Sequence, residues 1–148
     1  ITPAGIEKLS RSQTAAVLLP GVPFFLMMER KAPARELLDR GAIVALASDF
    51  NPGSSHLISM LLVMQLGVFT LKMSVEEALN ACTINAAYAI DRQHCCGSLE
   101  PGKDLDLILC DMPSYISLAY ELGRQPIKKV FKRGQVVVED HRIKTQII

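Results

Sequence analysis

The sequence lacks several features that would place it in large classes of proteins. It has no tryptophan, and aromatic residues make up only 5% of its 148 residues. Its 16 basic and 15 acidic residues leave a net charge of +1, which predicts no positive surface for nucleic acid. No apolar run reaches the roughly 18 residues that a membrane helix needs, and no secretory leader pattern opens the chain. We therefore expect neither a nucleic-acid partner nor a membrane.

Cysteine is scarce and shows no pattern of a disulfide framework. The four cysteines are even in number, but the sequence offers no secretory context for them. Cys82 and Cys110 lie in apolar surroundings, which suit buried thiols. We expect reduced cysteines and a cytoplasmic protein.

About half of the sequence is apolar, which is enough for a core of one average domain. The chain begins at Ile1 rather than Met, and Thr2-Pro3 begins a predicted helix with a cap and an early proline. A helix cap at the first residues, without a preceding Met, predicts that the chain is a piece of a longer protein.

The first half of the sequence predicts parallel strands covered by helices. Residues 15–19 form an apolar run that Pro20-Gly21 closes, as expected for a fully buried strand that ends in a turn. Residues 34–40 predict a helix closed by Gly41, and residues 43–47 predict a second buried strand. Apolar runs without alternation are typical of parallel sheets in α/β proteins.

Three further helices are predicted after the second strand. Residues 57–71 are apolar almost all round, which predicts a helix buried between layers and beginning close to His56. Ser74 and Glu77 form a capping-box pattern at the start of the next helix, and the small residues of 83–90 predict a closely packed third helix.

The pattern changes near residue 93. We expect residues 1–93 to form an α/β portion and residues 94–148 a small β-rich portion. The second portion contains predicted strands at 105–110, 127–132 and 136–139, a tight turn at 133–135 that makes a hairpin, and a short helix within 114–122.

Asp49 directly follows the second predicted strand and has two interpretations. It can cap a helix or close an Asx turn, since Asn51-Pro52-Gly53 supplies turn residues. In α/β folds, however, a carboxylate at a strand end can bind a divalent metal and accept a proton from its bound water. Gly53-Ser54-Ser55 at a helix start can also attract an anion through backbone N–H groups. The residues alone leave these alternatives open.

The histidines form no self-contained metal site in the sequence. His56, His94 and His141 include no pair at the spacing of two metal ligands. His94-Cys95-Cys96 is a poor chelate, because adjacent cysteines cannot easily bind one ion together.

Several segments together resemble imidazolonepropionases, a family within the amidohydrolase superfamily. The last of these segments is shared across the superfamily, whereas the first is more particular to imidazolonepropionases. The segments are Ser48-Asp49-Phe50-Asn51-Pro52-Gly53-Ser54, Thr83-Ile84-Asn85-Ala86-Ala87-Tyr88-Ala89 and Gly97-Ser98-Leu99-Glu100-Pro101-Gly102-Lys103.

The resemblance implies an α/β fold in which this chain is the C-terminal part of a metal-dependent (β/α)8 TIM-barrel hydrolase. Residues 1–93 would supply the last two barrel strands with their helices, and residues 94–148 would supply part of a composite β-sandwich. The implied reaction is hydrolysis of 4-imidazolone-5-propanoate to N-formimidoyl-L-glutamate in histidine degradation. The alternatives are another cyclic amidohydrolase or deaminase of the superfamily, or a non-catalytic anion-binding α/β module.

The resemblance also implies the site residues. Asp49 matches a ligand of zinc or iron that takes a proton from the attacking water, and Asn51, Gly53 and Ser54 match positions that hold the small-molecule substrate. The histidines that complete the family's metal site have no counterpart in this chain. The resemblance therefore implies a fragment that is inactive alone, and a homodimer is one assembly compatible with the complete enzyme.

Overall fold

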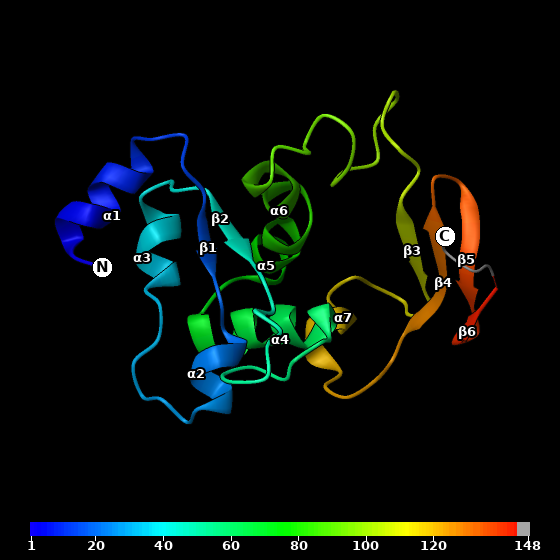
Figure 1. Cartoon of the computed structure of the whole chain (residues 1–148), viewed down its shortest axis with the longest axis horizontal. Coiled ribbons are helices and arrows are strands. Elements are labelled where there is room, and N and C mark those ends of the chain that lie inside the picture. The colour runs from blue at the N-terminus through cyan, green and yellow to red at the C-terminus, as the bar shows by residue number, and fades with distance from the viewer. Residues whose placement is uncertain (145–148) are drawn as a thin grey trace.

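The computed structural model describes residues 1–144 and has two parts (Figure 1). The first part contains six helices and a two-stranded parallel sheet, and the second contains a four-stranded antiparallel sheet. In the described residues, no helix is long and apolar enough to cross a membrane.

The parallel sheet consists of β1 (Ala16–Leu18) and β2 (Val44–Leu46), as the apolar runs predicted. Leu18 lies opposite Leu46 in the register. All of β2 is buried, which confirms its prediction. The prediction that β1 is fully buried was wrong, because Val17 is 47% exposed and lines an open pocket of about 400 Å³.

Three short helices belong to the N-terminal half. Helix α1 (Pro3–Ser10) begins as predicted, with the Thr2 side chain accepting the Gly5 N–H, and α3 (Ala34–Asp39) packs on β2. The turn predicted at Pro20-Gly21 is instead the start of helix α2 (Gly21–Phe25). Pro23 is tolerated there because the first turn of a helix leaves its N–H groups without intrahelical partners.

Helix α4 (Met60–Leu71) is the most apolar helix and packs across β2. It begins at Met60 and not near His56, because Ser59 caps it by accepting the Leu62 N–H. Gly67 permits the close approach, since an added Cβ would lie only 2.8 Å from Leu46 Cδ1. Gln65 is buried within this layer and donates to the Leu118 carbonyl over 2.8 Å.

Helices α5 (Val75–Cys82) and α6 (Ile84–Ala89) complete the layer against β2. The predicted capping box of Ser74 and Glu77 is present. Glu77 also accepts two hydrogen bonds of 2.8 Å from Arg35 in α3. The Asn85 side chain donates to the Val44 carbonyl over 2.9 Å and thereby anchors α6 to the strand.

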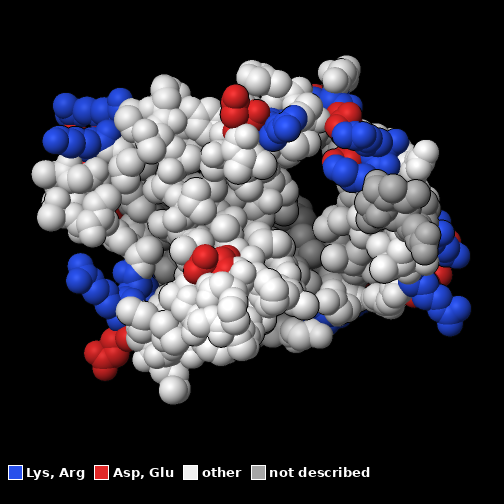
Figure 2. Space-filling model, viewed as in Figure 1, with Lys and Arg blue, Asp and Glu red and all other residues white. Residues whose placement is uncertain are grey.

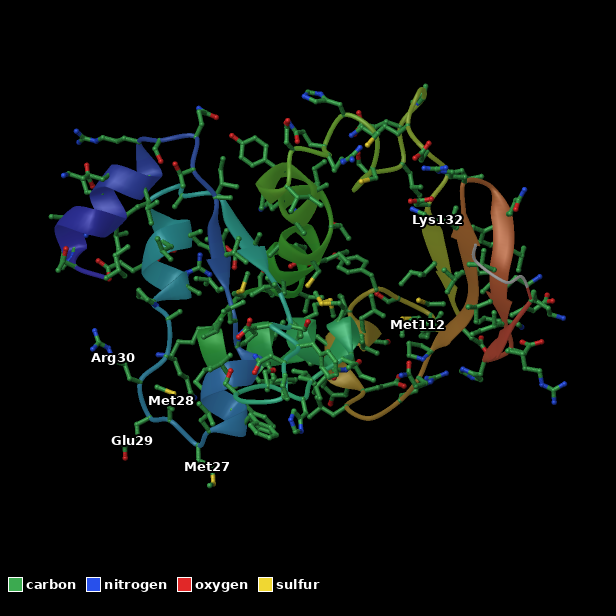
Figure 3. All side chains as sticks on the ribbon, in the orientation of Figure 1. Met27, Met28, Glu29, Arg30, Met112 and Lys132 are labelled. Carbon is green, nitrogen blue, oxygen red and sulfur yellow. The ribbon has the colours of Figure 1, made fainter. Side chains whose placement is uncertain are left out.

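The second part is the sheet in the order β3 (Leu107–Cys110), β4 (Ile127–Lys132), β5 (Gln135–Glu139) and β6 (Arg142–Ile143). The predicted hairpin between β4 and β5 is confirmed, and Arg133 and Gly134 turn it with φ values of 49° and 78°. Lys132, labelled in Figure 3, pairs with Asp106 beside this turn. The predicted helix is the shorter α7 (Ser117–Tyr120).

The hydrophobic core lies almost entirely in the first part. Its members come from both strands and from helices α1 and α3 to α5, and α7 adds Ala119 and Leu118 by packing against α4. Because the core packs around β1 and β2, it places the carboxyl ends of both strands on a rigid support.

Figure 2 shows most charged side chains near the margins of the viewed face.

Candidate functional site

The carboxyl ends of β1 and β2 meet at one edge because the two strands are parallel. Pro20 and Gly21 follow β1, and residues 48–55 follow β2. We call residues 48–55 the Asp49 loop. The sequence placed all four of its candidate residues in this loop, and the structure brings them together there.

Asp49 is an exposed residue of this loop. Its backbone lies in the left-handed region, at φ 49°. Few non-glycine residues adopt this conformation, and Asp and Asn tolerate it best. The Asn51 side-chain N–H groups lie 2.6 Å from the Asp49 carbonyl oxygen and 3.3 Å from its carboxylate Oδ2. Asn51 thus holds both the backbone and the carboxylate of Asp49.

The amide of Asn51 also organises the rest of the loop. Its Oδ1 accepts the backbone N–H groups of Gly53 and Ser54, each over 2.8 Å, and its Nδ2 donates to Ser54 Oγ over 3.0 Å. This is an Asx-type turn, but the side chain of Asn51 closes it and not that of Asp49, as one interpretation of the sequence had expected. The N–H groups of Gly53 and Ser54 are therefore engaged inside the loop in this structure.

The expected helix start near His56 was wrong, so the N-terminus of α4 does not directly follow Gly53-Ser54-Ser55. Helix α4 begins only at Met60, and Ser59 caps its first turn. His56 instead places Nε2 2.9 Å from the Pro52 carbonyl oxygen, and its ring lies 5.1 Å from the Phe25 ring at a tilt of 48°. These observations weigh against an anion-binding module built on the helix terminus.

Sequence reasoning missed one residue of the loop, Ser55. It is fully buried, and its hydroxyl donates to the Ser48 carbonyl over 2.9 Å. Two adjacent serines look alike in the sequence, because only the packing distinguishes the buried Ser55 from its partly exposed neighbour Ser54.

The residues present could supply one ligand to a metal ion, but not a complete site. Within residues 1–144, no three His, Cys, Asp or Glu side chains are grouped so that they could hold a metal. Asp49 fits the role of a single ligand, because it is exposed at a strand end and its carboxylate engages Asn51 only at 3.3 Å. The Cys95 and Cys96 thiols both donate to the Arg92 carbonyl instead.

The family model described as "Amidohydrolase family" matches residues 29–137. The chain belongs to the amidohydrolase family. Among curated amidohydrolase relatives, the imidazolonepropionase of Geobacillus sp. (strain WCH70) is 48% identical over 139 residues, which are 94% of this chain and 32% of that protein. The imidazolonepropionase of Treponema denticola is 42% identical over 143 residues, which are 97% of this chain and 35% of that protein.

Solved structures show the amidohydrolase fold. An adenosine deaminase from Xanthomonas campestris with bound zinc matches with a TM-score of 0.87 at 21% identity, over 97% of this chain and 36% of that one. An atrazine chlorohydrolase from Arthrobacter aurescens, complexed with zinc, matches with a TM-score of 0.76 at 22% identity, over 97% of this chain and 36% of that one.

The chain spans about a third of the length of the curated relatives that it matches. Within residues 1–144, β2, whose end carries Asp49, pairs with β1 alone.

Proposed function

We propose that this chain is part of an imidazolonepropionase, which hydrolyses the cyclic amide C–N bond of 4-imidazolone-5-propanoate to give N-formimidoyl-L-glutamate. One observation carries the proposal. Curated relatives at 42–48% identity over at least 94% of this chain are imidazolonepropionases. Alignments over 139 to 143 of the 148 residues cover the Asp49 loop and both of its supporting strands.

We propose that residues 1–93 form the last part of a (β/α)8 barrel, with β1 and β2 as its final two strands. The parallel pairing and the helices packed on β2 support this arrangement. Residues 94–148 would contribute to a β-sandwich, which the antiparallel sheet β3 to β6 supports.

An apolar surface beside β1 is consistent with additional chain packing there. Phe24 in α2 is 61% exposed, and Met27 and Met28, just after α2, are 90% and 48% exposed. Figure 3 shows Met27 on the outer side of the segment that joins α2 to α3 and Met28 on its inner side. Isolated exposed apolar residues are ordinary, but a contiguous group favours a covered surface in the longer protein.

Asp49 is the proposed metal ligand and proton acceptor, and zinc or iron is the proposed metal. A divalent metal held there would supply a bound water of lowered pKa. The Asp49 carboxylate would accept a proton from that water and pass it to the leaving nitrogen. Asn51 supports this role, because its side chain donates to both the carbonyl and the carboxylate of Asp49.

Asn51, Gly53 and Ser54 are the proposed substrate-binding residues. The N–H groups of Gly53 and Ser54 converge on one oxygen atom, the Asn51 Oδ1. A carboxylate oxygen of the propanoate arm would take the place of this amide oxygen. The Asn51 Oδ1 would then be free to accept a hydrogen bond from the polar ring of the substrate, while its Nδ2 keeps its contacts with Asp49.

The test is the activity of the longer protein that contains this chain. We expect it to hydrolyse 4-imidazolone-5-propanoate and to leave adenosine, guanine and hydantoin unchanged. Hydrolysis of hydantoin alone, or deamination of a purine alone, would favour the alternative of another cyclic amidohydrolase or deaminase. Sedimentation of the same protein would test the expected homodimer.

A further inference from the structure

Ser55 is one of two fully or nearly fully buried polar residues in the described chain, and Gln65 is the other. The exposed surface of Ser55 is 0%, although it closes a loop whose other members are mostly exposed or half-buried. A buried hydroxyl must find a partner, because an unpaired polar group loses its hydration without compensation. Its partner is the carbonyl oxygen of Ser48, at 2.9 Å.

This hydrogen bond acts at the residue directly before Asp49. The backbone N–H of Asn51 donates to the Ser55 carbonyl over 2.9 Å, so Ser55 holds the loop on both sides of Asp49. Asp49 needs this restraint, because its φ of 49° is a sparsely populated conformation that the surroundings must enforce.

The end of β1 confines Ser55 from the other side. Gly21 is buried, and an added Cβ would lie 3.1 Å from Ser55 Oγ and 2.9 Å from Leu57 Cδ2. Glycine at this position gives Ser55 room, because an added Cβ would force the hydroxyl to shift by a few tenths of an ångström. The hydroxyl is therefore wedged between the segment that follows β1 and the segment that follows β2.

We propose that Ser55 is a positioning residue for Asp49. Its hydroxyl restrains the Ser48 carbonyl, and this restraint fixes the backbone next to Asp49. The backbone in turn sets the direction in which the Asp49 carboxylate points. This role rests on the proposed function of Asp49 as a metal ligand. Groups that orient a ligand without touching the metal typically change metal affinity when they are removed.

The experiment measures Zn²⁺ affinity in the longer protein that contains this chain, by titration against a competing chelator. We expect Ser55→Ala to weaken Zn²⁺ binding about tenfold. Gly21→Ala keeps the Ser55 hydroxyl, but the added Cβ would crowd it. We therefore expect a smaller loss of Zn²⁺ affinity than for Ser55→Ala. Both variants are first shown to be folded by circular dichroism and thermal melting.

Gln65→Leu is the matched control. It removes an equally buried side-chain hydrogen bond to a carbonyl, that of Leu118, but this bond joins α4 to α7 rather than to the Asp49 loop. We expect Gln65→Leu to lower the melting temperature and to leave Zn²⁺ affinity within about twofold of the wild type.

The outcomes separate the two proposals. If the wild type binds neither Zn²⁺ nor Fe²⁺, or Asp49→Ala binds Zn²⁺ as tightly as the wild type, the proposed function of Asp49 is wrong. If Asp49→Ala loses Zn²⁺ while folded Ser55→Ala keeps wild-type affinity, the positioning role of Ser55 is wrong. The same conclusion follows if Gln65→Leu loses as much affinity as Ser55→Ala, because burial alone would then explain the effect.

Discussion

The two sheets of this chain differ in how far their strands β2 and β3 are buried. Every residue of β2 is buried beneath helices, whereas β3 shows Ile108 and Leu109 about half exposed. Both strands are short and apolar in sequence, with Val44-Ala45-Leu46 in one and Leu107-Ile108-Leu109-Cys110 in the other. The difference lies in what covers them, since α3 to α6 pack on β2.

This contrast shows which part of the chain can hold a site rigidly. The Asp49 loop follows the buried strand β2, where close packing limits movement of the strand end. The antiparallel sheet relies on its own ladders and on exposed ion pairs such as Arg133 with Asp104. Exposed pairs of this kind add little stability.

Equivalent leucine truncations in the two sheets should have very different effects. Leu46→Ala in β2 should lower the free energy of unfolding by about 3 kcal/mol, because Leu46 is 2% exposed and its Cδ1 packs on Gly67. Leu109→Ala should cost less than about 1 kcal/mol, since Leu109 is 48% exposed. Urea unfolding of the chain measures both values, and equal losses would contradict the contrast.

Acid sensitivity should also differ between the two parts. Hydrogen bonds from Arg35 lower the pKa of Glu77, and those from Lys129 lower the pKa of Glu139. A lowered carboxyl pKa in the folded state contributes stability that is present above the usual Glu pKa and is lost as the pH falls through the folded value. Stability should therefore decline below about pH 4.5.

Glu77→Gln should reduce this decline more than Glu139→Gln does. Glu77 accepts two hydrogen bonds from one guanidinium and also caps α5, whereas Glu139 pairs with two flexible lysines. Melting temperatures measured from pH 7 to pH 3 would show the difference. If the two variants show the same dependence of melting temperature on pH, the expected difference between the two parts of the chain is wrong.

The smallest expected effect concerns the thiols, which are all free cysteines. Burial raises the pKa of Cys82 in α5 to about 12 and also raises the pKa of Cys110 in β3. Because the thiolate is the reactive form, Cys82 should be alkylated more slowly than Cys110 at pH 8. Mass spectrometry of the chain during treatment with iodoacetamide measures the rate of alkylation of each thiol. Faster alkylation of Cys82 than of Cys110 would contradict the packing of α5.

Much of the fold was predictable where local signals and burial agree. The apolar run at 43–47 gave a buried strand because helices cover it, and the Ser74 and Glu77 pattern gave a capping box because both groups are local. The hairpin at Arg133-Gly134 was predictable from its turn residues. Free cysteines were also expected.

The missed features have both local and distant causes. Helix α2 contains Pro23 and begins with Gly21, so local propensity predicts a turn there. The start of α4 moved to Met60 because Ser59 caps it, while the apolar run alone begins three residues earlier. In the candidate site, the sequence located Asp49 and Asn51, but the burial of Ser55 depends on Gly21 and Leu57.

The most direct measurement is the hydrolysis of 4-imidazolone-5-propanoate by the longer protein carrying Asp49→Ala, beside Asp91→Ala as the matched control. Asp91 is also an exposed aspartate in the left-handed region, with φ 57°, but it follows α6 and lies outside the Asp49 loop. The account predicts a fall in kcat/KM of at least about 100-fold for Asp49→Ala and wild-type activity for Asp91→Ala. Wild-type activity in Asp49→Ala would contradict it.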